Sequence, residues 1–193
     1  MELYYLRHGQ TAWSLTGQHT GKTDLPLTPH GETEARSLVP LLAGIAFDQV
    51  LSSPRQRARR TADLAGHPGA IVEPDLAEWD YGDYDGLTLD EIRAQRPDWD
   101  IYRDGAPGGE SPDQIVARAD RLIARLTQQT GRVAAFSHGH FGRVLAVRWI
   151  GLPLAAAKHF AVDTASRSIL DRDPGRGGRA RIVQWNVRAA TTP

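Results

Sequence analysis

The first ten residues, Met1–Gln10, read MELYYLRHGQ and predict the class of fold. Their apolar run, Leu3–Leu6, does not alternate with polar residues, which is typical of a strand buried on both faces of a parallel sheet. The run stops at Arg7-His8-Gly9. Because ligands of open α/β sheets bind where such strands end, we expect a functional site here.

The three residues after this strand suit chemistry on a phosphoryl group. Arg7 offers a planar fork that matches phosphate oxygens. His8 offers a ring nitrogen that can be neutral, and therefore nucleophilic, near pH 7. Gly9 allows a tight turn that brings backbone N–H groups close to a ligand. A single histidine at a strand end is more often an ordinary surface or core residue, so the interpretation depends on partners elsewhere in the chain.

A second apolar run, Val133–Phe136, repeats this pattern. It ends in Ser137-His138-Gly139-His140, after which the sequence reads as a helix. Two buried strands that each end in His-Gly are hard to explain by structural needs alone. We expect His138 to donate to a phosphate opposite His8, while His140 either binds the ligand or only begins the helix.

An arginine-rich helix follows a further predicted strand, Val50–Ser53. Ser53-Pro54 is a typical helix start, and Gln56 would complete a capping box. Arg57 then lies in the first turn, on the same helix face as Thr61 and at the sheet edge that carries the histidines. Since two guanidiniums at one edge repel each other unless an anion lies between them, we interpret Arg57 as a second phosphate clamp.

The segment Leu76–Gly86 is dense in acidic and aromatic residues and lacks helical periodicity. A loop of this composition is typical of a functional site. One of its carboxylates would serve as general acid and base. A metal site is the alternative, although no histidine-rich ligand spacing accompanies the acids. The sequence does not decide among four candidates: Glu78, Asp80, Asp83 and Asp85.

The other elements fit an α/β protein. Capped helix starts are expected at Thr28-Pro29, Thr88 and Ser111-Pro112. Trp99–Gly109 carries turn signals and is expected to be irregular, either a lid over the site or a plain loop. The chain is expected to end in a hairpin at the sheet edge. This hairpin would join Ser168–Leu170 to Arg181–Trp185 across a turn at Pro174-Gly175.

Composition narrows the class of protein further. The 193 residues are 40% hydrophobic, which suits a single domain over residues 1–193. The 23 basic and 23 acidic residues balance, so neither a nucleic acid nor a membrane is expected as partner. Without cysteine, disulfides and thiolate metal sites are excluded. No signal peptide or membrane-spanning run is visible, so we expect a cytoplasmic protein; its oligomeric state is not predicted.

The separate motifs also carry a resemblance. The chain contains, in this order, Arg7-His8-Gly9, Arg57-Ala58 with Thr61, Glu78, and His138-Gly139. In this order they resemble the histidine phosphatase superfamily, of which the cofactor-dependent phosphoglycerate mutases are one branch. The resemblance implies a three-layer α/β/α sandwich with a mainly parallel central sheet, as in the phosphoglycerate mutases.

The resemblance also implies roles for individual residues. His8 would be phosphorylated, and Glu78 would be the proton donor and acceptor. Ser14 occupies a position where the mutases usually have an asparagine that binds phosphate. The implied phosphate pocket comprises Arg7, Arg57, His138, Ser14, Thr20, Gly21 and Gly139, with His140 and Tyr81 as further candidate ligand contacts.

Within the superfamily the details favour a phosphatase. Gly17–Asp24, Glu78–Tyr84 and Gly108-Gly109-Glu110-Ser111 are similar to broad-specificity acid phosphatases and sedoheptulose bisphosphatase-like members. The segment between Gly86 and the last of these motifs is shorter than in the mutases, where its basic residues hold a second phosphate. Here it supplies only Arg93, Arg96 and Arg103.

We therefore expect a metal-independent phosphatase that hydrolyses phosphate monoesters, sugar phosphates or a broad range, without a cofactor. A cofactor-dependent phosphoglycerate mutase is the first alternative, and an inactive module that binds a phospho-ligand is the second. A small-molecule phosphate ester is the expected partner. The leaving-group side would be lined by aromatic residues: Trp13, Trp79, Tyr81, Tyr84, Trp99 and Tyr102.

Overall fold

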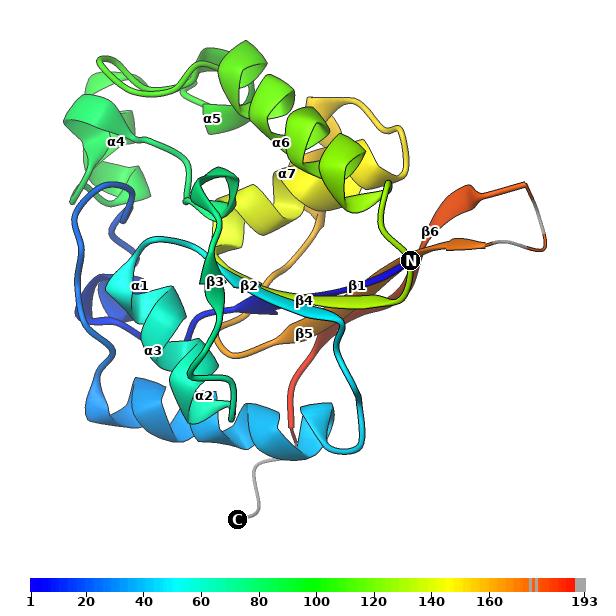
Figure 1. Ribbon diagram of the computed structural model, residues 1–193. Helices are drawn as coiled ribbons and strands as arrows, with labels where there is room; N and C mark the ends of the chain where they lie inside the picture. Colours follow the sequence, from blue (N-terminus) through cyan, green and yellow to red (C-terminus); the bar gives the residue numbers. More distant parts are fainter. Residues whose placement is uncertain (174, 176, 190–193) are drawn as a thin grey trace.

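A six-stranded sheet forms the centre of the computed structural model, which describes residues 1–173, 175 and 177–189 (Figure 1). The strand order is β3-β2-β4-β1-β5-β6. Neighbouring strands from β3 through β2 and β4 to β1 are parallel. Strand β5 pairs antiparallel with β1, and β6 pairs antiparallel with β5. The strands are β1 (Glu2–Arg7), β2 (Gln49–Ser52), β3 (Ile71–Val72), β4 (Arg132–Ser137), β5 (Arg167–Asp173) and β6 (Arg179–Val187).

Helices cover both faces of this sheet, with α6 and α7 on one side and α2 and α3 on the other (Figure 1). The predicted three-layer α/β/α sandwich with a mainly parallel sheet is thus confirmed. The α-helices are α1 (Ala12–Thr16), α2 (Pro29–Leu42), α3 (Gln56–Leu64), α4 (Leu89–Gln95), α5 (Ile101–Asp104), α6 (Pro112–Leu126) and α7 (Gly139–Trp149). Three short 3₁₀ helices are η1 (Pro74–Leu76), η2 (Gly82–Tyr84) and η3 (Leu154–His159).

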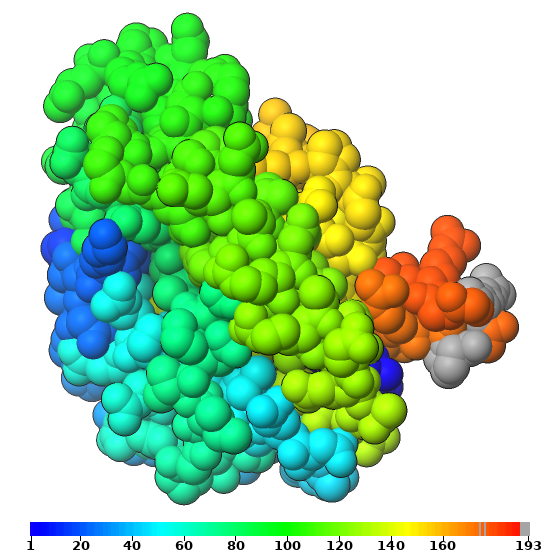
Figure 2. Space-filling model, turned by 45° about the horizontal axis from the view of Figure 1, so that its top comes forward, coloured from blue at the N-terminus to red at the C-terminus, as the bar shows by residue number. Residues whose placement is uncertain are grey.

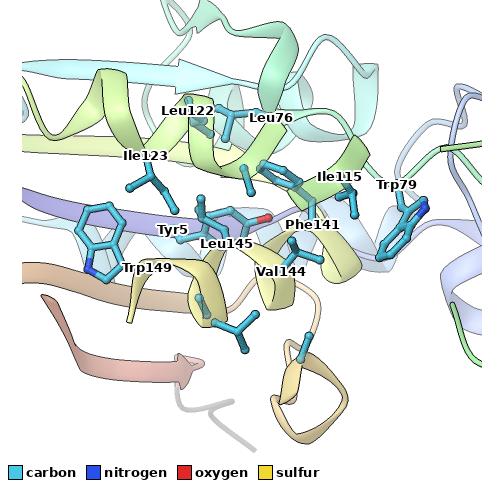
Figure 3. Packing of buried hydrophobic residues seen from close by; sticks show 14 of the residues in the cluster. Tyr5, Leu76, Trp79, Ile115, Leu122, Ile123, Phe141, Val144, Leu145 and Trp149 are labelled. Atoms are coloured by element: carbon cyan, nitrogen blue, oxygen red, sulfur yellow. The ribbon is translucent and has the colours of Figure 1, made fainter. Parts of the chain in front are cut away.

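Strand β1 is buried on both faces, as its apolar run predicts. Successive side chains of a strand point to opposite faces. Leu3 and Tyr5 accordingly pack in the cluster beneath α6 and α7, whereas Tyr4 and Leu6 pack in the cluster beneath α2 and α3. Figure 3 shows Tyr5 in the first of these layers, with Leu145 of α7.

The register brings the ends of three parallel strands together. Arg7 of β1 lies opposite Ser137 of β4, and Ser52 of β2 lies opposite Phe136. The residues that follow these strands therefore meet at one edge of the sheet. There the rings of His8 and His138 pack edge to face, with their centroids 5.2 Å apart.

The expected caps of three helices are confirmed. The hydroxyls of Thr28, Thr88 and Ser111 each accept a backbone N–H in the first turn of α2, α4 and α6. The predicted capping box of α3 is wrong. This helix begins at Gln56 after the N-cap Arg55 and has no side-chain cap. The Ser53 hydroxyl is instead 2.7 Å from Nε2 of His138, because the serine lies at the site edge.

One further expectation needs correction, and another is confirmed. Trp99–Gly109 is not wholly irregular, because Asp100 caps the short helix α5 by accepting the N–H of Tyr102; one helical turn is too short to give a periodic signal. The edge hairpin is confirmed: its strands β5 and β6 are longer than expected, and they project from the body (Figure 2). Of its expected turn, Pro174 lies outside the described residues.

Candidate active site

A pocket opens where β1 and β4 end. Its walls come from the β1–α1 turn, the loop before Gly21, the Glu78 loop and the first turn of α7. The lining residues are Arg7, His8, Ser14, Gly17, Gln18, His19, Thr20, Glu78, Tyr81, Gly139, His140 and Arg143. Segments far apart in the sequence thus enclose one polar cavity.

The ring of His8 has a defined tautomer. Its Nδ1 lies 2.7 Å from the backbone carbonyl of Gly9, and because a carbonyl can only accept, Nδ1 carries the proton. Nε2 is then the nitrogen with the free lone pair. Burial, followed by the charges of Arg57 and Arg7, lowers the pKa of His8 well below its ordinary value. His8 is therefore neutral at pH 7, as a nucleophile must be.

Two arginines bring unsatisfied donors to this pocket. Nε of Arg7 and Nε of Arg143 are buried and have no hydrogen-bond partner among the described residues. Arg7 is anchored at its other end, where Nη1 donates to the carbonyl of Val162 at 2.5 Å. Buried donors without partners are rare because desolvation is costly. Because both arginines line the pocket, their positive charge favours an anion there.

Arg57 and His138 lie directly behind the pocket wall. The fully buried Arg57 guanidinium donates to the backbone carbonyls of Thr20, Gly21 and Thr23 and, through Nε, to Nδ1 of His138 at 3.2 Å. Nδ1 of His138 is thus the acceptor, and its Nε2–H donates to the Ser53 hydroxyl. Burial and the Arg57 charge lower the pKa of His138 well below its usual value. Direct contact of either residue with a phosphate stays a prediction.

The carboxylate of Glu78 is held at the N-terminus of α7. Oε1 accepts the N–H groups of Phe141 at 2.7 Å and Trp79 at 2.9 Å, and Oε2 accepts that of His140 at 3.0 Å. The first N–H groups of a helix lack partners within the helix and favour a negative charge. Oε2 carries the smaller share of these bonds and is therefore the oxygen better placed to exchange a proton.

Of the other three acids of this loop, two have structural partners and one is exposed. Asp85 accepts from Gly21 N–H at 2.6 Å and binds Thr23, Asp80 pairs with Lys22 at 2.7 Å, and Asp83 is exposed. Of the four candidate carboxylates, only that of Glu78 lines the pocket with His8. The alternative was that these acids bind a metal ion. Within residues 1–173, 175 and 177–189, no group of three or more histidine, aspartate or glutamate side chains is placed to hold one.

Arg118 of α6 fixes the backbone that carries Glu78. Its guanidinium donates to the carbonyls of Asp75, Ala77 and Glu78 and forms a two-bond ion pair with Glu110. All five of its N–H groups are used in this way. Glu110 belongs to the Gly108–Ser111 motif, so this motif acts by anchoring the loop of the candidate acid.

These observations agree with comparisons of the whole chain. The sequence profile of the histidine phosphatase superfamily, branch 1, matches residues 3–188. The chain belongs to this superfamily. The predicted enzyme class, a phosphatase acting on phosphate esters, is thereby confirmed.

Known members of the superfamily are similar over most of this chain. An acid phosphatase of Mycobacterium tuberculosis is 46% identical over 177 residues, which cover 90% of this chain and 87% of that protein. The sedoheptulose 1,7-bisphosphatase of Saccharomyces cerevisiae is 40% identical over 181 residues, which cover 76% of this chain and 66% of that protein. A solved structure of an open reading frame product from M. tuberculosis superimposes with a TM-score of 0.92 at 41% identity and covers 98% of each chain.

Within this histidine phosphatase, most of the predicted binding residues line the pocket with His8. Ser14, Thr20 and Gly139 do so, although the Ser14 hydroxyl also accepts the Thr11 N–H in the cap of α1. Gly21 lies outside the pocket, with its N–H bound to Asp85.

Two further predicted ligand contacts, Tyr81 and His140, form a pair in the pocket wall. The Tyr81 hydroxyl lies 2.6 Å from Nδ1 of His140. Burial raises the pKa of Tyr81 and lowers that of His140, so both side chains are neutral at pH 7. His140 is the second residue of α7 and also lines the pocket, and its contact with a ligand stays a prediction.

The expected use of Gly9 is wrong. Its N–H donates to the Thr61 hydroxyl at 3.1 Å rather than pointing at a ligand. The position requires glycine for a different reason: a Cβ there would lie 2.2 Å from the carbonyl oxygen of Gly31 in α2. Gly9 therefore lets the first turn of α2 approach the end of β1.

The charged pocket residue that the sequence analysis did not predict is Arg143. Arg143 lies four residues after Gly139, on the same face of α7, and therefore reaches the same pocket. This helical spacing from the His-Gly turn is the signal that could have identified it.

No described helix is long and apolar enough to cross a bilayer.

Proposed function

We propose that this histidine phosphatase hydrolyses phosphate monoesters without a metal ion, through a phosphohistidine formed on His8. The observation that carries the proposal is the hydrogen bond from Nδ1 of His8 to the Gly9 carbonyl. It leaves the Nε2 lone pair free in a pocket that also contains Arg7 and Glu78. A nucleophile, a proton carrier and a positively charged guanidinium are the groups that phosphoryl transfer needs.

In the first step Nε2 of His8 attacks the phosphorus in line. The bond from phosphorus to the ester oxygen breaks as the Glu78 carboxyl, protonated at Oε2, gives its proton to the departing alcohol. Arg7 and Arg143 donate to the equatorial oxygens through groups that have no other partner. Arg57 and His138 lie behind the pocket wall. There burial, together with the Arg57 charge, lowers the pKa of His8 and keeps its ring neutral before attack.

In the second step a water molecule attacks the phosphohistidine. The Glu78 carboxylate, now without its proton, accepts a proton from this water, and the bond from phosphorus to Nε2 breaks. Inorganic phosphate leaves, and both residues return to their starting states. Because the carboxyl must begin protonated, we expect an acidic or near-neutral optimum rather than a rate that rises into alkaline pH.

Phosphate esters of sugars, or a broad range of esters, are the proposed substrates. Support comes from the names of the similar proteins, an acid phosphatase and a sedoheptulose bisphosphatase. A phosphoglycerate mutase from Methylobacterium is also similar, at 34% identity. A mutase returns the phosphoryl group to its product, whereas the short segment after Gly86 leaves few basic residues for holding that product.

The experiment is a measurement of inorganic phosphate release in excess chelator. The panel contains sugar bisphosphates, sugar monophosphates, 3-phosphoglycerate and a chromogenic ester, each with the wild type and with His8→Ala. Release that persists in chelator and disappears in the variant supports the proposal. Release that the chelator abolishes, isomerisation of 3-phosphoglycerate without release, or binding without turnover would each overturn it.

Two expectations about the cellular setting also remain proposals. We infer a cytoplasmic location and partners limited to small phosphate esters, with no nucleic acid or membrane. The support is the balanced charge of 23 basic and 23 acidic residues. Cell fractionation and retention on a nucleic acid column would test both.

A further inference from the structure

The peptide group between Gly9 and Gln10 is hydrogen-bonded on both sides. Its carbonyl, which belongs to Gly9, accepts the Nδ1–H of His8 at 2.7 Å. Its N–H, which belongs to Gln10, donates to Oε2 of Glu34 at 2.8 Å. One peptide group thus connects the carboxylate of Glu34 to the ring of the proposed nucleophile. No step of the proposed mechanism uses Glu34.

The close packing of α2 against the end of β1 brings Glu34 to this peptide. A Cβ at Gly31, in the first turn of α2, would lie 2.0 Å from the carbonyl oxygen of Gln10. Residues three apart in a helix share a face, so Glu34 follows Gly31 on the face that meets this turn. Its side chain is buried, with 8% exposed. A buried carboxylate is costly unless its oxygens are hydrogen-bonded.

The two oxygens of this carboxylate have different partners. Oε1 accepts the hydroxyl of Thr164 and Nη2 of Arg188, each at 2.9 Å, and lies 3.6 Å from Nε2 of His30. Among the residues that the structure describes, Oε2 has the Gln10 N–H as its one hydrogen-bond partner. Oε1 therefore ties α2 to the segments around β5 and β6, whereas Oε2 binds the peptide beside the nucleophile.

We propose that Glu34 is a positioning residue for the nucleophile, because its carboxylate polarises the Gly9–Gln10 peptide and so strengthens the hydrogen bond between that carbonyl and His8. The inference rests on the proposed attack by His8. Hydrogen bonds that follow one another through a polar group polarise each other, most strongly where water is excluded. A carboxylate bonded directly to Nδ1–H of a catalytic histidine stabilises the imidazolium that forms. Here one peptide group lies between the two.

The effect is largest when the ring of His8 becomes positive. As Nε2 forms its bond to phosphorus, the ester oxygen leaves with the proton of Glu78, and the ring takes up positive charge. Its Nδ1–H is then a stronger donor, since hydrogen bonds of ionised groups are about twice as strong as neutral ones. Glu34 thus lowers the barrier to phosphorylation without changing the binding of the phosphate ester, where the ring is still neutral.

The test replaces the carboxylate by its neutral amide. In Glu34→Gln we expect kcat/KM for p-nitrophenyl phosphate, which reports phosphorylation of His8, to fall about three- to tenfold, the difference between a charged and a neutral acceptor. The inhibition constant of inorganic phosphate should change less than about twofold, because binding does not charge the ring. In proton NMR the Nδ1–H resonance of His8, assigned by its loss in His8→Ala, should move upfield as its hydrogen bond weakens.

Two control variants remove partners of Oε1 and leave the bond of Oε2 in place. Arg188→Gln breaks the ion pair, and Thr164→Val removes the hydroxyl. Both should keep the kcat/KM and the Nδ1–H resonance of the wild type.

A measurement on the wild type decides the question even if Glu34→Gln does not fold. Orthovanadate resembles the transferring phosphoryl group and bonds to a histidine nitrogen in its place. Its binding should move the Nδ1–H of His8 and the backbone N–H of Gln10 downfield together, because one peptide group connects them.

The outcomes separate this inference from the proposed function. Equal losses of kcat/KM in Glu34→Gln and in both controls overturn it, since Glu34 would then only tether α2. Wild-type kcat/KM in Glu34→Gln, or a Gln10 N–H that vanadate does not move, overturns it as well. Hydrolysis at His8 stands in each of these cases. Persistent phosphate release by His8→Ala overturns the proposed function instead.

Discussion

The guanidinium of Arg118 lies over the ring of Phe141, with Cζ 4.5 Å from the ring centroid. The backbone N–H of Phe141 donates to Oε1 of Glu78, and Arg118 binds the carbonyl of Glu78. One side chain of α6 thus fixes both the loop that carries the proposed acid and the helix turn that receives its carboxylate.

Arg118→Lys should slow catalysis without weakening substrate binding. A lysine offers three donors where Arg118 uses five, so the Glu78 loop would lose part of its anchor. We expect kcat to fall about tenfold and KM to change less than about twofold, because a misplaced acid affects the reaction more than binding. Steady-state kinetics checks this. Arg121→Lys, on the same helix in an exposed pair with Asp75, is the control and should behave as wild type.

Glu78→Gln should separate the two chemical steps. Loss of a general acid and base slows turnover about 10²–10⁴-fold on an alkyl phosphate. Nitrophenolate leaves without needing a proton, so p-nitrophenyl phosphate should still phosphorylate His8 quickly while water attack stays slow. Rapid mixing should show a burst of nitrophenol close to one per active site. Equal slowing of both steps, with no burst, would remove Glu78 from the role of acid.

Gly9→Ala should destabilise the fold. The new Cβ would lie 2.2 Å from the Gly31 carbonyl oxygen, and backbone rather than a flexible side chain must move. Overpacking of this kind costs about 1–3 kcal/mol of unfolding free energy, measured by urea denaturation. Gly69→Ala is the matched control, since nothing lies within 4 Å of its Cβ position. An unaltered midpoint in Gly9→Ala would contradict the close approach of α2.

Stability should fall as the pH is lowered below about 6.5. Burial holds the pKa of His8, His138 and His140 well below the ordinary value in the folded chain. Unfolded histidines bind protons from about pH 6.5 downward, so in this window the unfolded state binds more protons and gains stability. Each histidine contributes up to about 1.4 kcal/mol per pH unit. Denaturation at several pH values checks this, and His8→Asn should show a shallower slope.

Much of the sheet and part of the site were predictable because their signals are local. The buried runs before His8 and His138 each identify a strand and its end, and parallel strands bring such ends together. Arg57 was placed correctly in the first turn of α3, because helix geometry depends on neighbouring residues only.

The remaining features depend on tertiary contacts that the local sequence does not encode. Glu78 differs from Asp80 and Asp85 only because the N-terminus of α7 lies against it. Gly9 meets Gly31 across the fold rather than along the chain. The hydroxyl of Ser53 was assigned to a capping box of α3. It accepts the N–H of Arg55, before the helix, and bonds the ring of His138 from another strand end.

The central claim is a covalent phosphohistidine on His8, and acid-free quenching tests it most directly. The enzyme is mixed with a substrate, stopped in alkali within milliseconds, digested and analysed by mass spectrometry. We expect one phosphoryl group on the peptide that contains His8, labile to acid and absent in His8→Ala, whose turnover should fall at least about 10³-fold. Full turnover without a labelled His8, or a label on another residue, would contradict the account.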